Sequence, residues 1–369
     1  MAIANALFKT DENFNVEIVS FGDSNLSDRR FRLVSIEESI KMLSKNGLID
    51  YFNTDNPTST QIESAIEKYK IQVGHDTRPF FDGKLIELAM LSVDDCIKKA
   101  KITPSEIEKF HFVSNTLKPN EGYSSQADAV MKQLSLLYPG PQGLSKGYAK
   151  FSQEACSIGV LGVIEDACII QAGLVSSSLI TAAELATKLA DPDEWKFHNL
   201  FGDRSGSIYI RRGERSFLAM GAKTFPYSSP DSPSRDSKDL ITQKEDGYLF
   251  QDGQAVFKWV NGTMLKELKK SLEEIDFDYS VIDHIVYHQP SIKLSQTLRE
   301  NTKNKFPKFK GNIPFDKNAG NTSSASTLSL LSRLIDSGEI KPGEIVLVCA
   351  FGAGLTWAFY IFIAPRLIK

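Results

Sequence analysis

Stretches rich in β-branched and aromatic residues alternate along this chain with stretches whose apolar residues recur at helical spacing. The alternating apolar pattern predicts strands at residues 16–21, 109–115, 178–183, 206–211, 216–221, 281–287, 344–350 and 355–363. The helical spacing predicts helices at residues 60–72, 84–100, 125–136, 156–173, 256–274, 291–303 and 321–336. Because the two kinds of segment alternate, we expect a layered α/β fold.

The second half of the chain repeats the pattern of the first. A helix that opens at Cys156 leads into the strand at 178–183, and a helix that opens at Asn321 leads into the strand at 344–350. We therefore predict two duplicated halves, residues 1–215 and 216–369, with the reaction centre at their interface. The helix after Cys156 is apolar nearly all round, as expected of a helix buried between layers, and residues 226–247 are predicted to form a surface loop.

Composition narrows the class of protein. A chain of 369 residues is long enough for two domains with a large core, and its net charge of -3 gives no general attraction to nucleic acid or to membranes. The N-terminal segment is too polar for a signal peptide, and no apolar run is long enough for a transmembrane helix, so we expect a cytoplasmic protein. The four cysteines lack metal-ligand spacing, which predicts no metal site.

Three short strings carry the candidate chemistry: EACSIG around Cys156, VYHQPS around His288 and NAGNTSSAS around Asn321. A cysteine thiol can hold an acyl group as a thioester, while His and Asn can hydrogen-bond the carbonyl oxygen of a second thioester as its α-carbon becomes a nucleophile. This division of labour favours carbon–carbon bond formation over hydrolysis. At a helix start, unpaired N–H groups and the helix dipole are expected to lower the pKa of the Cys156 thiol.

Each of these residues also has a structural interpretation. His288 can be a hydrogen-bonded polar residue at a strand end, and Asn321 can cap a helix, with Thr322 and Ser323 nearby as further caps. The order of the three strings favours the catalytic interpretation, with Asn321 preferred over Asn318. The other cysteines lie within apolar patterns and are expected to be small buried hydrophobes: Cys96, Cys168 and Cys349.

The chain resembles β-ketoacyl-acyl-carrier-protein synthase III, a family with the thiolase fold. The resemblance rests on HQPSIKL, on AGNTSSAS before a helix, on QDGQAVFKWVNGTMLKEL, and on the C-terminal VCAFGAGLTWAFYIF, and it covers most of the chain. It implies a five-layered α-β-α-β-α architecture, a homodimer, and catalytic roles for Cys156, His288 and Asn321. It further implies an oxyanion hole formed by the backbone N–H groups of Cys156 and Ala353, although FGAG can also be only a tight turn.

Glu154 departs from the family pattern, which has small apolar residues before the cysteine. Residues i and i+2 of an extended segment point to the same side, so Glu154 is expected to face the cavity that Cys156 enters. A buried carboxylate there would have a raised pKa and would serve as a general base. The alternative, at even weight, is an ion pair with Lys150, Arg204 or another cation at the subunit interface.

Two reactions are compatible with these residues. Among synthase III relatives, the chain is similar to the ketosynthase/cyclases that make dialkylresorcinol and stilbene precursors. That resemblance implies that a Cys156-bound α,β-unsaturated acyl chain is joined to a β-ketoacyl thioester by Michael addition and Claisen condensation, giving a cyclohexane-1,3-dione, with Glu154 as base. The alternative is a primer synthase that condenses acyl-coenzyme A with malonyl-acyl carrier protein and loses carbon dioxide. A non-catalytic binding partner of an active synthase is disfavoured, because the chain retains all three candidate catalytic strings.

The second substrate is expected to arrive on acyl carrier protein or coenzyme A, since a pantetheine arm must reach a buried cysteine. No other cofactor is expected. Acyl carrier proteins are acidic, so a basic rim is expected around the site entrance. Lys293, just past His288, is the candidate carrier-binding residue. A run of further lysines is better explained as a solvated face: Lys303, Lys305, Lys308 and Lys310.

Overall fold

Two five-stranded sheets form the centre of the protein in the computed structural model, which describes residues 6–116, 123–139, 148–225, 241–243, 247–353 and 355–366. The first sheet has the order β2 (Val16–Asp23), β8 (Asp203–Arg212), β7 (Ser177–Leu185), β5 (Lys109–Val113) and β6 (Tyr148–Ser152). The second has the order β1 (Ala6–Lys9), β9 (Phe217–Thr224), β14 (Thr356–Ile363), β13 (Ile345–Gly352) and β12 (His284–Tyr287).

The two sheets repeat one topology. In the first, β5 and β7 are parallel, whereas β7–β8 and β8–β2 are antiparallel. In the second, β12 and β13 are parallel, whereas β13–β14 and β14–β9 are antiparallel. The predicted duplication therefore appears in the strand order. The boundary near residue 215 stays a prediction: β8 and β9 lie in different sheets, but the N-terminal strand β1 pairs with β9.

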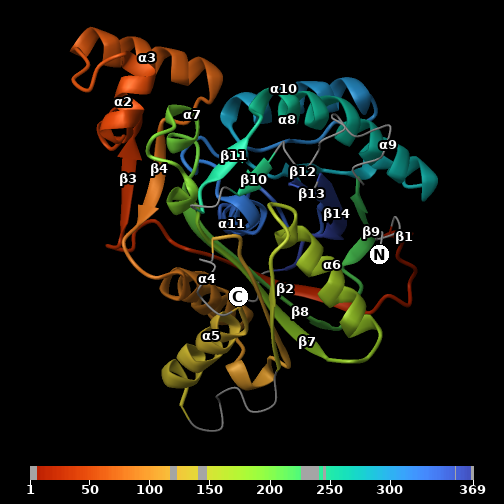
Figure 1. The fold of residues 1–369 in the computed structure, drawn as a ribbon. Coiled ribbons are helices and arrows are strands. Elements are labelled where there is room, and N and C mark those ends of the chain that lie inside the picture. The colour runs from red at the N-terminus through yellow and green to blue at the C-terminus, as the bar shows by residue number, and fades with distance from the viewer. Residues whose placement is uncertain are drawn as a thin grey trace.

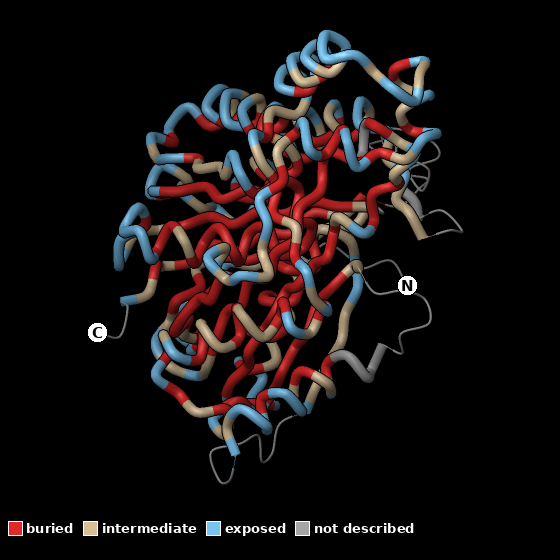
Figure 2. Tube along the Cα trace, turned by 90° about the vertical axis from the view of Figure 1, so that its left-hand side faces the viewer, coloured by how far each residue is buried: buried red, intermediate tan, exposed pale blue. Residues whose placement is uncertain are grey.

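Helices cover both outer faces and fill the space between the sheets (Figure 1). Between the sheets lie α6 (Ile158–Gln171) and α11 (Ser326–Asp336), which share one apolar core with both sheets. The outer face of the first sheet packs on α4 (Leu85–Ala100) and α5 (Tyr123–Leu137). The outer face of the second packs on α8 (Gly253–Trp259), α9 (Leu265–Glu274) and α10 (Ile292–Lys305). This is the predicted five-layered thiolase architecture, and Figure 2 shows the buried residues running through its interior.

A small subdomain projects from the first half. It contains the antiparallel pair β3 (Phe31–Ser35) and β4 (Thr77–Phe81) with helices α1 (Ile36–Lys41), α2 (Lys45–Phe52) and α3 (Ser59–Gln72). Figure 1 shows α2 and α3 standing apart from the layered body. Its small core includes Trp195 of α7 (Trp195–His198), which stacks on Tyr51 with ring centroids 4.0 Å apart.

The predicted elements are present, with shifted ends. The predicted 256–274 helix is α8 and α9 joined by a π-helical turn (Val260–Met264), and the strand predicted from 281 begins at His284. Of the predicted loop 226–247, residues 241–243 instead form strand β10 (Ile241–Gln243), paired with β11 (Leu249–Gln251). Residues 226–240 and 244–246 lie outside the described residues. Within the described part of the chain, no helix is both long and apolar enough to cross a membrane.

Candidate active site

Cys156 lies between β6 and α6, at the junction of the two sheets. Helix α6 begins at Ile158, so Cys156 precedes its first turn by two residues and does not open it as predicted. The residue before it, Ala155, has a φ of 51°, in the left-handed region that a non-glycine residue rarely adopts. The chain thus makes a sharp, strained turn that presents the thiol at the start of a buried helix.

The Cys156 thiol is not acidified by the helix in this structure. Burial raises its pKa to about 11, an effect that the hydrogen bond with Ser323 partly opposes and the charge of Glu184 increases. The prediction of a lowered thiol pKa is therefore wrong, because removal of water from the thiolate outweighs the favourable helix start.

Cys156 and Asn321 are brought together through Ser323. The Cys156 Sγ and Ser323 Oγ atoms are 3.5 Å apart, and the Ser323 N–H donates to Asn321 Oδ1 at 2.9 Å. Asn321 therefore caps the short 3₁₀ turn η7 (Ser323–Ala325) with its own oxygen, whereas Thr322 makes no side-chain cap hydrogen bond. Because the oxygen is occupied by this cap, the amide Nδ2 is the group left to act on a substrate.

The backbone of Asn321 is held by a loop of the first half. Its N–H donates to the Leu200 carbonyl at 2.8 Å, and its carbonyl accepts from the Gly202 N–H at 3.1 Å. A side chain on Gly202 would meet the Ala319 carbonyl oxygen at 2.2 Å, so glycine is required for this close approach. The buried Arg78 guanidinium of β4 donates to the Phe201 carbonyl at 2.7 Å, which fixes the same loop.

His288 follows β12 and is 2% exposed. Its Nδ1 lies 2.7 Å from the Ser326 hydroxyl at the start of α11, and its ring packs edge-on against Phe351, with centroids 5.3 Å apart. Burial lowers the pKa of His288 to about 3. The imidazole is therefore neutral near pH 7.

The turn after β13 lies directly against the nucleophile. A side chain on Gly352 would come within 2.7 Å of the Cys156 backbone nitrogen, so the glycine backbone is close to the predicted oxyanion donor. Ala353 follows at the half-exposed turn, whereas Gly354 lies outside the described residues. The predicted pairing of the Cys156 and Ala353 N–H groups is compatible with this proximity and stays a prediction.

Glu154 is exposed, although it is only two residues from Cys156. Partial shielding from water by the surrounding chain and the charge of Glu165 raise the pKa of its carboxyl, and Lys150 opposes the shift. The predicted partners bind elsewhere: Lys150 pairs with Glu165 at 2.6 Å, and Arg204 pairs with Asp23 at 2.8 Å. The predicted ion pair with Arg204 is therefore wrong, since that guanidinium is buried against another carboxylate.

Lys293 is exposed on α10, and its backbone N–H donates to the Val73 carbonyl at 3.2 Å. Ser291 caps α10 by accepting a hydrogen bond from the Leu294 N–H at 3.2 Å. Cys96 and Cys349 are buried and Cys168 is half-buried, as expected for apolar packing. All four cysteines are free thiols.

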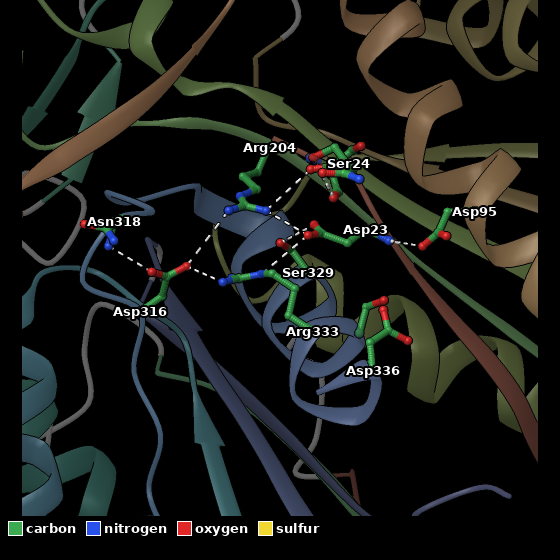
Figure 3. A network of polar contacts seen from close by, with 12 residues as sticks. Asp23, Ser24, Asp95, Arg204, Asp316, Asn318, Ser329, Arg333 and Asp336 are labelled. Carbon is green, nitrogen blue, oxygen red and sulfur yellow. Dashed lines mark hydrogen bonds and ion pairs between the residues drawn. The ribbon is translucent and has the colours of Figure 1, made fainter. Parts of the chain in front are cut away.

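A charged cleft of about 710 Å³ lies between the halves, and none of Cys156, His288 and Asn321 lines it. Figure 3 shows its alternating charges: Arg204 contacts Asp23, and Arg333 of α11 contacts Asp316. The Arg204 and Asp316 charges lie 4.0 Å apart, and the Arg333 and Asp23 charges lie 3.4 Å apart. This network joins β2 and β8 of the first sheet to α11 of the second half. The exposed Asn318 lies at this cleft, away from Cys156.

Sequence reasoning missed the polar residues around the catalytic strings. Ser326 contacts His288, and Asn115 and Glu184 lie in the hydrogen-bond network next to the Cys156 turn. Glu184 had one available signal, since it is an acidic residue at the end of the apolar strand SLITAAEL. Asn115 had none, because its importance depends on contacts with residues far away in sequence.

Comparisons with known proteins agree with this geometry. Residues 272–362 match the family model for the 3-oxoacyl-[acyl-carrier-protein (ACP)] synthase III C terminal. Over 326 residues the chain is 26% identical to β-ketoacyl-[acyl-carrier-protein] synthase III of Clostridium tetani. The aligned region covers 82% of this chain and 89% of that protein. The chain is therefore similar to β-ketoacyl-acyl-carrier-protein synthase III over most of its length.

Solved structures show the same fold for this synthase III-like chain. The 3-oxoacyl-[acyl-carrier-protein] synthase III of Aquifex aeolicus superposes with a TM-score of 0.73 at 20% identity, covering 94% of this chain and 99% of that one. The priming β-ketosynthase of the R1128 polyketide pathway superposes with a TM-score of 0.77 at 18% identity, covering 98% and 99%. The thiolase architecture is therefore shared over nearly the whole chain.

Proposed function

We propose that this synthase III-like protein condenses an acyl group held on Cys156 with a malonyl thioester, releasing carbon dioxide and a β-ketoacyl thioester. It is an acyltransferase that forms carbon–carbon bonds. The Cys156 thiol first exchanges with an acyl thioester and frees the carrier thiol. Loss of carbon dioxide from the malonyl group then leaves an enolate, which attacks the acyl carbonyl and expels the Cys156 sulfur.

One observation carries the proposal: Asn321 Oδ1 and His288 Nδ1 each make a local hydrogen bond, which leaves Asn321 Nδ2 and His288 Nε2 as the atoms to meet a substrate. Asn321 Oδ1 accepts a hydrogen bond from the Ser323 N–H, so the Asn321 Nδ2 group is left to donate to a substrate oxygen. His288 is neutral, and its Nδ1 lies 2.7 Å from the Ser326 hydroxyl. In the tautomer that the proposal requires, this hydroxyl donates to Nδ1 and the ring proton lies on Nε2. Two neutral donors are suited to stabilise an enolate oxygen, which is the requirement of the decarboxylative step.

A hydrolase would need a different arrangement. In a Cys-His hydrolase the imidazole takes the proton of the thiol and must lie within hydrogen-bond distance of it. Among the described residues, the side-chain contact of the Cys156 sulfur is with Ser323, and the hydrogen bond of the His288 ring is with Ser326. Because no hydrogen bond joins the two side chains within the described part of the chain, we favour acyl storage on Cys156 and enolate stabilisation at His288.

The ketosynthase/cyclase reaction is the second candidate, and the Glu154 environment favours it. The raised pKa of this carboxyl, two residues before the nucleophile, suits a base that removes a proton from an unactivated carbon. Its exposure in the single chain favours the decarboxylative reaction, which needs no added base. We therefore place the cyclohexane-1,3-dione product, the precursor of a stilbene or dialkylresorcinol, second.

Intact-protein mass spectrometry with a panel of acyl-coenzyme A thioesters tests the nucleophile. The wild type and the control variant Cys168→Ala, whose thiol is half-buried within α6, are expected to gain one acyl mass. Cys156→Ala is expected to gain none. His288→Ala and Asn321→Ala are expected to load normally and to lose condensation by about a hundredfold, the scale of an oxyanion-type donor. A full adduct on Cys156→Ala would refute the assignment.

Glu154→Gln separates the two reactions. The amide keeps the size of the side chain but cannot accept a proton, so a cyclase should load normally and lose product by about a hundredfold. A decarboxylative synthase should turn over at the wild-type rate, release carbon dioxide from malonyl thioester, and yield a linear β-ketoacyl product. The product masses from an enoyl substrate with a β-ketoacyl partner decide which reaction occurs.

The carrier and the oligomeric state are part of the proposal. Substrates would arrive on acyl carrier protein or coenzyme A, no cofactor beyond their phosphopantetheine arms is needed, and Lys293 would contact the carrier. A homodimer is proposed through β6, which is an edge strand of its sheet among the described residues and carries the 49%-exposed Tyr148. Light scattering after gel filtration tests the dimer. Lys293→Glu should raise KM for an acyl-carrier-protein substrate without changing Cys156 alkylation.

A further inference from the structure

Glu184 is a buried carboxylate with no part in the proposed reaction. It lies near the end of β7 and is completely inaccessible to solvent. Among the described residues no cation lies within ion-pair distance of it, although burying an unpaired carboxylate costs several kcal/mol. Burial raises its pKa, and hydrogen bonds from Ser324 and Asn115 oppose that shift. A charge this costly is retained only where its hydrogen bonds compensate for lost water.

Most of the hydrogen bonds to the Glu184 carboxylate come from the segment after β5. The Asn115 backbone N–H donates to both carboxylate oxygens, at 3.1 and 3.0 Å, and the Ser114 hydroxyl donates to Oε2 at 3.2 Å. The Asn115 side chain also donates to Oε1, at 3.0 Å. Glu184 therefore fixes both the backbone and the side-chain orientation of Asn115.

Asn115 then connects Glu184 to the nucleophile turn and to the other half of the protein. Its Nδ2 donates to the Ala155 carbonyl at 2.9 Å and to Ser323 Oγ at 3.1 Å. The Ser324 hydroxyl donates directly to Glu184 Oε1, which also accepts from Asn115. Ser323 and Ser324 follow Asn321, so the carboxylate holds residues from both halves.

The two turns that this network holds are both strained. Ala155 has a φ of 51° and Ser323 a φ of 47°, and neither is glycine. Such a conformation costs on the order of 1 kcal/mol per residue and persists only where surrounding contacts enforce it. Ala155 precedes Cys156, and Ser323 lies 3.5 Å from the Cys156 sulfur. Both strained turns are therefore next to the reacting atom.

We propose that Glu184 is a positioning residue that holds the Cys156 turn and the Asn321 segment at a fixed separation through Asn115, Ser323 and Ser324. The inference deepens the proposed function, because that separation decides where the acyl carbonyl lies relative to the donors that stabilise the enolate. Misplacement of reacting groups by about 1 Å costs about a hundredfold in rate.

Two substitutions at Glu184 test the role. Glu184→Leu removes every acceptor, and is expected to slow both Cys156 acylation and condensation by about a hundredfold per folded molecule. Glu184→Gln is the conservative variant: its amide oxygen can replace Oε1, and its NH₂ can donate to the Ser114 hydroxyl. It is expected to retain both rates within about threefold, the scale of one weakened hydrogen bond.

The matched control is Thr181→Val in the same strand. Thr181 is buried and hydrogen-bonds Ser207 at 2.9 Å, so the control loses a buried strand hydroxyl without touching the Cys156 network. It is expected to lower the melting temperature and leave both rates per folded molecule unchanged. A Glu184→Leu variant that behaves like Thr181→Val would reduce Glu184 to a structural residue and overturn the proposal.

Amide hydrogen exchange gives a readout that needs no substrate. In Glu184→Leu, the peptides that cover 153–158 and 320–326 are both expected to exchange at least about tenfold faster than in the wild type. A peptide from β14 should keep its wild-type exchange rate. Unchanged exchange in both peptides refutes the positioning role even if the wild type fails to take an acyl group. Failure of wild-type acylation, with faster exchange in the variant, would instead refute only the proposed function.

Discussion

Acid sensitivity of the fold can be worked out from a buried histidine outside the candidate site. His75 precedes β4 and is 1% exposed. Burial first, and then the positive charge of Arg78, lower its pKa to about 4 from an ordinary value of 6.5, while the Lys317 backbone and Asp316 oppose the shift. His75 is therefore neutral in the folded protein over a pH range in which it is charged in the unfolded chain.

The sign of the effect follows from proton counting. Between pH 6.5 and about pH 4 the unfolded chain binds a proton at His75 that the folded protein does not bind. Stability therefore increases with pH in this window and is lost as the pH falls. At about 1.4 kcal/mol per pH unit, His75 alone costs about 2 kcal/mol of unfolding free energy at pH 5 relative to pH 8. His198, with a pKa lowered to about 4 mainly by burial, adds a similar amount.

His75→Gln tests this account, because glutamine keeps a polar side chain but does not titrate. Urea unfolding of wild type and variant at pH 8 gives the packing cost of the substitution, since His75 is neutral in both states there. Between pH 8 and pH 5 the unfolding free energy of the variant should fall by about 2 kcal/mol less than that of the wild type. Groups other than His75 titrate in both proteins, so their contributions cancel in this difference. Equal losses in the two proteins would refute the reasoning.

Three further predictions concern single contacts. Alkylation of Cys156 by iodoacetamide should rise about tenfold per pH unit from pH 8 to 10, because its thiol pKa is about 11, and a plateau by pH 8 would contradict this. Gly352→Ala places a methyl 2.7 Å from the Cys156 nitrogen and should slow acylation by about a hundredfold, whereas Gly262→Ala, where nothing lies within 4 Å, should not. Asp166→Leu leaves the buried Lys109 ammonium unpaired and should cost about 3–5 kcal/mol in urea unfolding, much of which Lys109→Met in the same chain should recover.

The sequence alone determined the layered architecture and the three candidate catalytic residues. Strand and helix periodicity is a local property, so elements such as α4 and β13 were predicted within a few residues of their bounds. Cys156, His288 and Asn321 were identified because each lies in a short string whose residue types have specific chemistry. The short strands β3, β4 and β6 were missed, since they are too short to show a period and are formed by pairing with distant partners.

Only the tertiary structure decided the electrostatics and the connections of the site. The Cys156 helix start predicted an acidic thiol, but burial by surrounding layers raises its pKa instead. Glu154 was predicted to face the cavity and is exposed, whereas Glu184, which received no role, holds the turn next to Cys156. Burial and hydrogen bonding depend on segments far apart in the chain, such as the 208 residues that separate Asn115 from its partner Ser323. Such partners are brought together only by the packing of the two halves, so no local pattern in the chain records them.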